Sequence, residues 1–300
     1  MDTEQKLAKQ ELLETVVYKP VSPFVTKIVS TKLLTPEGHS EEVRHIIVDL
    51  KGSGLSYTEG QSLGVVPPGN TDKGKPHHVR LYSIASARGG DAGYPETAAI
   101  CVKRVIEKQS EEEIYLGVAS NHLCDLREGD TVHVTGPVGK AFVLPADPSV
   151  DLIFVATGTG IAPYRSFIEY ICRIHNGWTG DIILAMGARN QKELIYMNEI
   201  NDDLLRVVHT KQCHFLTARS REETTSDGKR MYVQHRLAEQ MDSIKSMLRR
   251  DNFAVYICGL KGMDHGVEEV FSQAYGDTQT VWEERKTRLK HQGRWNVEVY

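Results

Sequence analysis

The sequence predicts two domains, an N-terminal antiparallel β-barrel followed by a C-terminal α/β domain with a doubly wound parallel sheet. The chain has 300 residues, which suits two domains of ordinary size. Up to about Pro145, short β-branched segments alternate with turn residues, as in a barrel. After Pro148, apolar strands alternate with helical stretches, which indicates βαβ units. We therefore expect a tail or short helix at 1–20, the barrel at 21–147 and the α/β domain at 148–300.

Each predicted element has a local reason. An acidic start and a modest apolar stripe favour a short amphipathic helix or a loose tail at the N-terminus. Barrel strands are expected where β-branched residues are bounded by Gly and Pro turns, at 24–29, 43–48, 62–66, 98–103 and 131–135. The strands of the second domain are expected to be more continuously apolar, as buried parallel strands are, at 152–156, 181–186 and 253–258.

Composition excludes several classes of protein. The formal net charge of -4 gives no basis for nucleic-acid binding. No run approaches the about 18 apolar residues that a membrane span needs. The N-terminus lacks the features of a signal or transit peptide, so we expect a cytoplasmic protein, or a plastid stromal protein if this is a processed form. We also expect a monomer. The five cysteines contain no C-x-x-C pair, so we expect no metal site, cluster or disulfide framework.

Two stretches of the barrel domain point to a dinucleotide. In Arg80-Leu81-Tyr82-Ser83, strand alternation puts the guanidinium and the phenol ring on one face. Together they suit a ligand with a pyrophosphate and a flat aromatic system, a flavin dinucleotide, although an edge strand with an exposed arginine explains the tetrapeptide alone. Further on, Ser120 and Asn121 precede an apolar helical run and look like a helix N-cap, where phosphate binds readily. A capped helix without a ligand is the equal alternative.

The second domain has a glycine-rich turn. Thr157-Gly-Thr-Gly160-Ile-Ala-Pro163 follows a strand and precedes a helix, with the proline at a plausible first helical position. Glycines there let the backbone approach a pyrophosphate at the carboxyl end of a parallel strand. A lone G-x-G also marks a plain tight turn, and the acidic ribose ligand usual in NAD proteins is not evident downstream.

With Tyr256-Ile-Cys-Gly-Leu260 and the terminal Trp295-Asn-Val-Glu-Val-Tyr300, these motifs form an ordered set. The set resembles the plant-type (plastidic-class) ferredoxin–NADP(H) reductases, from about Val21 to the last residue. The resemblance implies an enzyme with FAD and NADP(H) as cofactors. It would transfer hydride between NADP(H) and FAD, and single electrons between FAD and ferredoxin or flavodoxin.

For FAD, the resemblance implies a site lined by Arg80, Leu81, Tyr82, Ser83, Ser86, Cys101, Lys103, Gly117, Val118, Ala119 and Ser120. Tyr82 would pack on one flavin face, and Ser83 would lie by N5.

Two positions depart from the family. Ala119 stands where a cysteine is common, and Glu107 stands where plastid enzymes have a tyrosine that stacks on adenine. A carboxylate cannot stack, so the sequence leaves the placement of adenine open.

For NADP(H), the resemblance implies contacts from Thr157, Thr159, Gly160, Pro163, Gly187, Ala188, Arg189, Ser220, Arg221, Arg230, Tyr232, Gln234, Gly259, Leu260 and Tyr300. A 2′-phosphate needs charge-assisted donors, which Ser220, Arg221 and Arg230 would supply. Tyr232 would cover adenine. Without the family, the arginines at 219–221 would be a solvated loop and Arg189 an exposed turn residue.

Four residues are implied in the chemistry, namely Ser83, Cys258, Glu298 and Tyr300. Cys258 would shape the nicotinamide pocket without acting as a nucleophile, although a strand-end cysteine is most often a small buried hydrophobe. Glu298 would orient Ser83 or relay its proton. The Tyr300 ring would stack on the free flavin face until NADPH displaces it, although chain ends fray by default.

An acidic carrier would dock on cations, for which the candidates are Lys27, Lys32, Lys73, Lys75, Lys103, Arg104, Lys286 and Lys290. Taken singly, each is more often an ordinary solvated charge. Two other functions stay open. One is the reductase component of an oxygenase, of the benzoyl-CoA epoxidase type, which usually carries a ferredoxin domain; no cysteine precedes Cys101, so we expect no such domain here. The other is a flavin-binding regulatory protein without turnover.

Overall fold

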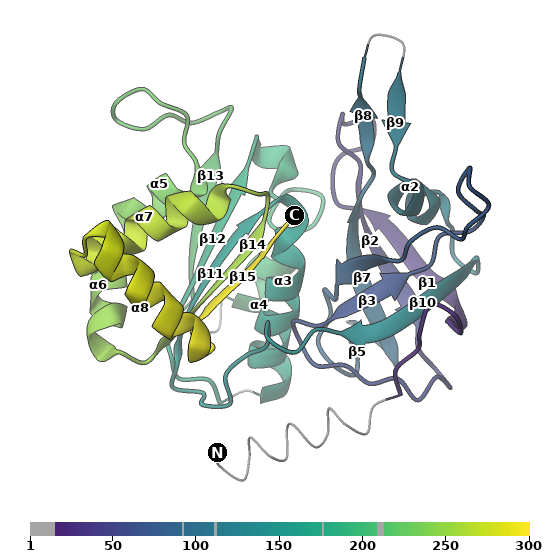
Figure 1. Cartoon of the computed structure of the whole chain (residues 1–300), viewed down its shortest axis with the longest axis horizontal. Coiled ribbons are helices and arrows are strands. Elements are labelled where there is room, and N and C mark those ends of the chain that lie inside the picture. The colour runs from purple at the N-terminus through teal and green to yellow at the C-terminus, as the bar shows by residue number, and fades with distance from the viewer. Residues whose placement is uncertain (1–15, 92, 111–112, 176, 209–212) are drawn as a thin grey trace. The chain divides into compact units, whose positions relative to one another are not determined.

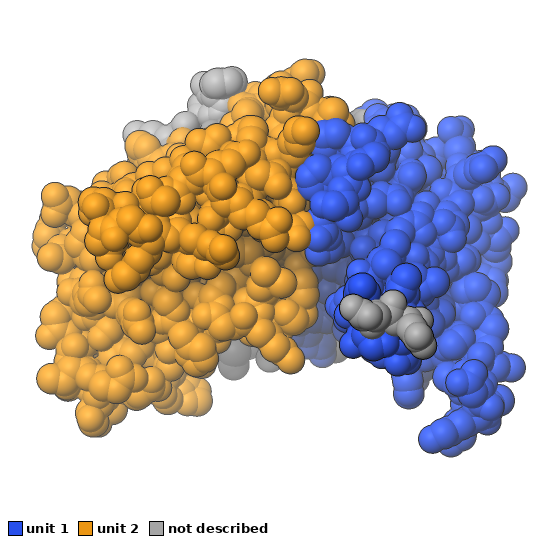
Figure 2. Space-filling model, turned by 90° about the horizontal axis from the view of Figure 1, so that it is seen from above, with its two compact units in different colours: residues 1–146, 165–170 blue, residues 147–164, 171–300 orange. Residues whose placement is uncertain are grey.

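The computed structural model describes residues 16–91, 93–110, 113–175, 177–208 and 213–300 (Figure 1). The chain forms two compact units, shown in separate colours in Figure 2. Unit 1 consists of Met1–Ala146 and Arg165–Tyr170, and unit 2 of Asp147–Tyr164 and Ile171–Tyr300. The first 15 residues of the expected N-terminal tail or helix lie outside the described residues.

Unit 1 is built on an antiparallel sheet in the order β4-β3-β10-β1-β2-β7. Its strands are β1 (Phe24–Leu33), β2 (Val43–Asp49), β3 (Ser62–Val65), β4 (Arg80–Ser83), β7 (Thr97–Lys103) and β10 (Thr131–Val138). The two ends of the sheet meet, because Ile84, directly after β4, bridges to Ile100 of β7. The sheet therefore closes into the predicted barrel.

Alternating aliphatic side chains fill the barrel, as the strand period of two requires. The core includes Ile28, Ile46, Val48, Leu63, Val65, Ile100, Val132 and Val134. Helix α2 (Val118–Asp125) adds Leu123 and Cys124 to this core. Two small antiparallel pairs complete the unit, β5 (Gly90–Asp91) with β6 (Tyr94–Pro95) and β8 (Ile106–Lys108) with β9 (Ile114–Leu116).

Strand β1 runs four residues beyond the expected 24–29, to Leu33. Its pairing with β2 shifts register between Ile28 and Ser30. A bulge of this kind breaks the apolar alternation while the strand continues. The polar residues after Val29 therefore hid the second half of the strand.

Unit 2 contains a parallel sheet in the order β13-β12-β11-β14-β15. The strands are β11 (Asp151–Thr157), β12 (Ile182–Ala188), β13 (Cys213–Arg219), β14 (Phe253–Gly259) and β15 (Trp295–Val299). Strand β11 lies between β12 and β14, so the strand order reverses beside it. In doubly wound sheets, ligands bind outside the carboxyl ends of the strands at this switch point.

Helices cover both faces of the parallel sheet (Figure 1). They are α3 (Ala162–Glu169), α4 (Asp203–Val208), α5 (Val233–Glu239), α6 (Met241–Arg250), α7 (Met263–Tyr275) and α8 (Gln279–His291). Helices α5 to α8 share one apolar core with Ile153 and Val155 of β11. On the other face, the rings of Phe154 and Tyr164 stack with centroids 4.9 Å apart. No helix among the described residues is long and apolar enough to cross a membrane.

A 3₁₀ turn over Gly158–Ile161 leads directly into α3. The sequence predicted Pro163 as the first residue of this helix, but it is the second residue of α3. Helix α3 also belongs to both units, since Arg165–Tyr170 is counted with unit 1.

Candidate functional site

Strand β4 carries the Arg-x-Tyr-Ser motif of unit 1. Tyr82 pairs with Leu63 of β3, and its half-buried ring packs against the barrel core. Burial raises the pKa of Tyr82, so its phenol stays protonated at neutral pH. Arg80 is exposed, donates to the carbonyl oxygen of His78 at 3.3 Å and forms no ion pair with any described residue. Because Arg80 and Tyr82 share one face of β4, a guanidinium without a carboxylate partner lies beside an aromatic ring.

The helix that follows the β8–β9 ribbon begins earlier than predicted. Helix α2 starts at Val118 with Gly117 as its N-cap, and no side chain caps it. The predicted cap at Ser120 and Asn121 is wrong. Ser120 lies inside the first turn, where its Oγ donates to the Gly117 carbonyl and accepts from the Val105 N–H, both at 3.1 Å. The backbone N–H groups of the first turn are left without a side-chain acceptor, which suits an anion.

Glycine is required at the start of α2. A Cβ on Gly117 would lie 2.7 Å from Ser120 Oγ and 2.8 Å from Val105 Cβ. The absence of a side chain therefore lets the ribbon turn tightly into the helix.

Three residues predicted to line the flavin site have other environments. Ser86 is fully buried, with its Oγ 2.8 Å from the Tyr57 hydroxyl and accepting from the Ala99 N–H at 2.9 Å. Its side chain bonds within the barrel and is not exposed, so its place in the flavin site stays a prediction. Cys101 is 5% exposed, and Lys103 forms an ion pair with Glu41. Ala119 and Ser120 are also buried.

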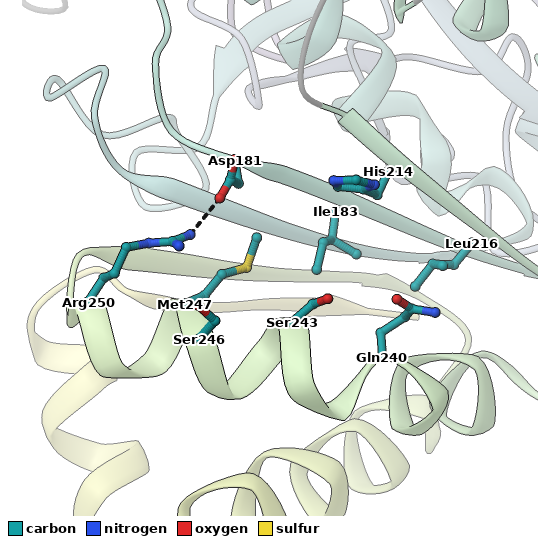
Figure 3. A pocket seen from close by; sticks show the side chains of 9 residues that line it. All are labelled: Asp181, Ile183, His214, Leu216, Gln240, Ser243, Ser246, Met247 and Arg250. Carbon is teal, nitrogen blue, oxygen red and sulfur yellow. Dashed lines mark hydrogen bonds and ion pairs between the residues drawn. The ribbon is translucent and has the colours of Figure 1, made fainter.

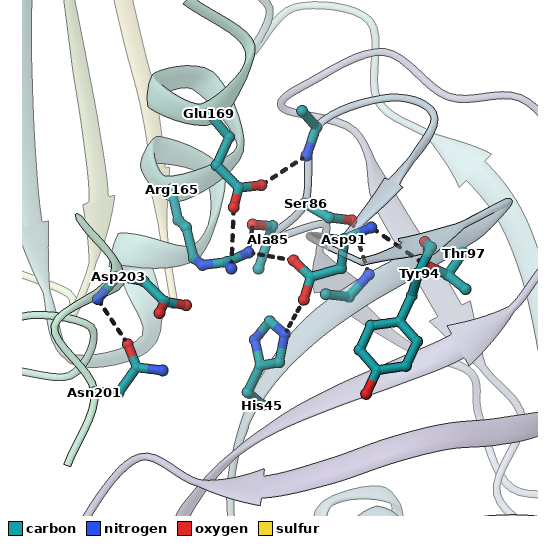
Figure 4. A network of polar contacts seen from close by, with 12 residues as sticks. His45, Ala85, Ser86, Asp91, Tyr94, Thr97, Arg165, Glu169, Asn201 and Asp203 are labelled. Atoms are coloured by element: carbon teal, nitrogen blue, oxygen red, sulfur yellow. Dashed lines mark hydrogen bonds and ion pairs between the residues drawn. The ribbon is translucent and has the colours of Figure 1, made fainter. Parts of the chain in front are cut away.

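A buried ionic network in unit 1 was not predicted from the sequence (Figure 4). His45 Nε2 lies 3.0 Å from Asp91 Oδ2, Arg165 Nη1 donates to Asp91 Oδ1 at 2.8 Å, and Arg165 Nη2 donates to Glu169 Oε1 at 3.0 Å. All four residues are buried. Burial alone would raise the pKa of Asp91, but the hydrogen bond from His45 and the charge of Arg165 outweigh it and hold that pKa well below its ordinary value.

The same network holds the backbone that follows the motif strand. Arg165 Nη1 donates to the Ala85 carbonyl at 2.7 Å, and Glu169 Oε2 accepts from the Ala87 N–H at 3.2 Å (Figure 4). Ala85 follows Ser83 by two residues, so α3 fixes the exit of β4. The available signal in the sequence was a pair of opposite charges one turn apart in an otherwise apolar helix.

In unit 2, several residues predicted to bind NADP(H) lie together at the switch point of the sheet. Thr157 ends β11, and its Oγ1 accepts from the Leu260 N–H at 2.9 Å. A Cβ on Gly160 would lie 2.1 Å from the Cys258 carbonyl oxygen, and one on Gly259 would lie 2.3 Å from Thr157 Oγ1. Glycine at both positions therefore brings the two strand ends into contact. Nothing lies within 4 Å of a Cβ on Gly158 among the described residues, so the outer side of the turn is open.

The C-terminal segment joins this cluster. Tyr300 follows β15, donates its N–H to the Gly259 carbonyl at 3.0 Å and lies with its hydroxyl 2.6 Å from Thr159 Oγ1. Glu298 pairs with Cys258 across β14 and β15. Burial raises the pKa of Glu298, which favours its protonated form. Burial and then the charge of Glu298 raise the pKa of Cys258 to about 12, so the thiol is a poor nucleophile at neutral pH.

The loops after β12 and β13 lie side by side. Ser220 donates its N–H to the Ala188 carbonyl at 2.9 Å, and Arg221 donates to the Arg189 carbonyl at 2.8 Å. The Arg189 side chain is bound to Glu193 at 2.8 Å. Gly187 and Pro163 are buried, and the Gln234 side chain packs against Gly266.

The cations in and next to the loop between β13 and α5 fall into two groups. Arg219 and Arg236 both bind Glu223 at 2.8 Å, and Lys229 binds Asp227 at 2.8 Å. Arg221 and Arg230 are exposed and form no ion pair with any residue that the structure describes. Beside Arg230, the Tyr232 ring is 44% exposed. The two arginines that the sequence assigned to a phosphate are thus the two whose charge is not already neutralised.

A separate groove of about 160 Å³ lies near the start of β12 (Figure 3). It is lined by Asp181, Ile183, His214, Leu216, Gln240, Ser243, Ser246, Met247 and Arg250. Arg250 Nη2 is bound to Asp181 Oδ2 at 2.6 Å. None of the predicted site residues lines this groove, which is at the opposite ends of the strands from the switch point.

The predicted docking cations also divide. Five are exposed and form no ion pair within the described part of the chain, namely Lys27, Lys32, Lys73, Lys75 and Lys290. Arg104 is bound to Glu42 at 2.7 Å with 16% of its side chain exposed, and Lys286 to Glu268 at 2.8 Å with 12% exposed. These two, and Lys103 on Glu41, already have carboxylate partners and are weaker docking candidates than the other five.

Several known proteins match this chain in sequence. Residues 154–269 match the family described as oxidoreductase NAD-binding domain. The chain is 41% identical to a ferredoxin–NADP reductase of Thermosynechococcus vestitus, covering 95% of this chain and 74% of that protein. It is 39% identical to one of Spirulina, covering 95% and 97%, and 38% identical to the chloroplastic leaf isozyme 1 of Arabidopsis thaliana, covering 94% and 79%.

A solved structure is similar over the whole chain. It is the ferredoxin–NADP+ reductase from Plasmodium falciparum with 2'P-AMP, with a TM-score of 0.72 and 25% identity, covering 96% of this chain and 100% of that one. The protein is thus an oxidoreductase of NADP(H)-linked electron transfer, and the chain belongs to the ferredoxin–NADP reductase family.

Proposed function

We propose that the protein is an FAD-dependent reductase that transfers hydride between NADP(H) and FAD and single electrons between FAD and ferredoxin or flavodoxin. Its relatives are named ferredoxin–NADP reductases. The observation that carries the NADP(H) assignment is the pair Arg221 and Arg230, exposed and without carboxylate partners beside a half-exposed Tyr232. A 2′-phosphate dianion needs such charge-assisted donors, and NAD lacks that group.

The residues of unit 1 fit FAD. Arg80, without a carboxylate partner, and the uncapped start of α2 would share the pyrophosphate, and the Tyr82 ring would cover one face of the isoalloxazine. Gly117 and Val118 would let the phosphates approach the helix start. FAD, when bound, exchanges a hydride at N5 and releases electrons one at a time.

The residues of unit 2 fit the rest of NADP(H). The open turn at Gly158, with Thr157, Thr159 and Gly160, would cradle its pyrophosphate at the switch point. Ser220 would add a hydroxyl beside Arg221 for the 2′-phosphate. The Plasmodium relative was solved with 2'P-AMP, which carries that same phosphate.

Four side chains would manage the reacting groups. Ser83 would place its hydroxyl near flavin N5, and Glu298, with its raised pKa, would hold a proton at the carboxyl end of the parallel sheet. Protonated Cys258 would shape the nicotinamide pocket without nucleophilic attack. The Tyr300 ring would occupy the nicotinamide position until NADP(H) binds, and its hydrogen bond to Thr159 would hold it there.

The electron carrier would be an acidic ferredoxin or flavodoxin. Lys27, Lys32, Lys73 and Lys75 of unit 1 remain as docking charges, with Lys290 of unit 2. Docking on exposed charges should weaken steeply with salt. We propose a monomer that works in the cytoplasm or, for a processed form, in the plastid stroma.

Steady-state kinetics test this proposal. The purified protein should be yellow, oxidise NADPH with ferricyanide, and reduce cytochrome c only when ferredoxin or flavodoxin is added. A yellow protein with negligible NADPH oxidation would instead be a flavin-binding module. Reduction of an oxygenase but neither carrier would assign the chain to an oxygenase system. A colourless protein that takes up no FAD would refute the proposal.

A further inference from the structure

The ribbon of β8 (Ile106–Lys108) and β9 (Ile114–Leu116) exposes an unusual amount of apolar surface. All six strand residues are exposed, and Figure 1 shows the ribbon extending beyond the barrel of unit 1. The exposed fractions are 58% for Ile106, 62% for Ile114, 42% for Tyr115 and 54% for Leu116. Exposed apolar side chains in such number on one short ribbon suggest that part of it contacts a ligand or a partner.

The strand register sorts these side chains by face. Glu107 stands directly opposite Tyr115, whereas Ile106 faces Leu116 and Lys108 faces Ile114. Directly opposite residues share a face, and neighbours along a strand alternate. One face of the ribbon therefore carries Glu107 and Tyr115, and the other carries the aliphatic residues. The Tyr115 side chain makes no hydrogen bond or ring contact with the residues described in the structure.

The ribbon leads directly into the uncapped helix. Leu116 ends β9, Gly117 is the N-cap and α2 starts at Val118. Tyr115 precedes Gly117 by two residues, which is about 7 Å along a strand. A dinucleotide whose pyrophosphate lies at the start of α2 would extend its adenosine half over such a distance, toward an exposed aromatic ring.

We propose that Tyr115 stacks on the adenine of FAD. The inference rests on the proposed function, because it takes FAD as the ligand. An aromatic ring offers a π face to a purine, and the Glu107 carboxylate does not. The Cβ atoms of directly opposite residues are about 5 Å apart. A ring at position 115 therefore covers nearly the same space as a ring at position 107 would. The adenine can thus stack on an aromatic ring even though residue 107 is a glutamate.

Flavin titration of the apoprotein tests the assignment without any measurement of turnover. Flavin is removed, and FAD or FMN is added back while flavin fluorescence is followed. Tyr115→Ala should weaken FAD binding about 5- to 150-fold, the range for one base on one ring. FMN has no adenosine, so its affinity should not change. Tyr115→Phe should bind FAD like the natural protein.

Two further variants sharpen the test. Ile114→Ala removes an equally exposed side chain from the other face of the ribbon and should leave both affinities unchanged. Glu107→Tyr added to Tyr115→Ala should restore FAD binding from the opposite strand. Unchanged FAD affinity in Tyr115→Ala would overturn the inference, and so would an equal loss for FAD and FMN. Slower ferredoxin reduction with unchanged FAD binding would assign Tyr115 to a partner surface and overturn it too. If the natural apoprotein binds neither flavin, it is the proposed function that fails.

Discussion

Replacing Arg221 by alanine should weaken the binding of NADPH and spare that of NADH. Arg221 is exposed and has no carboxylate partner among the described residues, so its charge is available to a ligand. A hydrogen bond to a charged group contributes about 1.5–3 kcal/mol. Solvent screening at an exposed site favours the lower end, about 1.5 kcal/mol, which corresponds to about tenfold in affinity. Arg230→Ala should have an effect of the same size.

Lys229→Ala provides a matched control, because Lys229 lies in the same loop but its charge is already balanced by Asp227 at 2.8 Å. The measurements are KM and kcat with NADPH and with NADH, and calorimetric titration with 2′-phospho-AMP and with AMP. In Arg221→Ala, KM for NADPH should rise about tenfold at unchanged kcat, since the 2′-phosphate is remote from the chemistry. Equal losses for NADPH and NADH, or an equal effect of Lys229→Ala, would show that the phosphate binds elsewhere.

Three other predictions concern the switch point of unit 2. Tyr300→Ser should tighten NADP+ binding in calorimetry and raise NADH turnover, because the ring no longer occupies the nicotinamide place; unchanged affinity would count against this. Burial raises the pKa of Glu298 from 4.5, so the folded state holds that proton more tightly than the unfolded chain. Its contribution to the free energy of unfolding should therefore fall as pH rises from 4.5 through the raised pKa, and Glu298→Gln should abolish this dependence in urea unfolding at a series of pH values. Gly160→Ala would put a Cβ 2.1 Å from the Cys258 carbonyl oxygen and should cost about 1–3 kcal/mol in thermal unfolding, whereas Gly177→Ala, whose nearest contact is 3.5 Å, should be mild.

The sequence predicted the two sheets well because local patterns encode them. Short alternating strands and longer apolar strands differ in period and burial, and both are visible within ten residues. The glycine-rich turn also identified the switch point. Residue 160 has to be glycine because a Cβ there would lie 2.1 Å from the carbonyl oxygen of Cys258, at the end of the neighbouring strand.

Contacts between distant positions were not predictable in the same way. The Arg165–Asp91 ion pair joins residues 74 positions apart, so no local pattern signals it. The same reason explains why the carboxylate partners of some candidate docking cations were not foreseen, since Lys286 looks solvated until Glu268 is placed beside it. The start of α2 was missed because Ser120 is a favourable N-cap residue, and packing against Val105 selected Gly117 instead.

The double membership of α3 has a consequence for dissecting this protein into parts. A gene fragment that stops at Ala146 encodes every barrel strand but not Arg165 or Glu169. Asp91 would then keep only His45 as a partner, and the Ala85 carbonyl and the Ala87 N–H would lose the side chains that bind them. Part of what the barrel packs against is thus synthesised after the first strand of the other unit, and a truncated barrel should be less stable in urea unfolding than one to which a peptide containing α3 is added in trans.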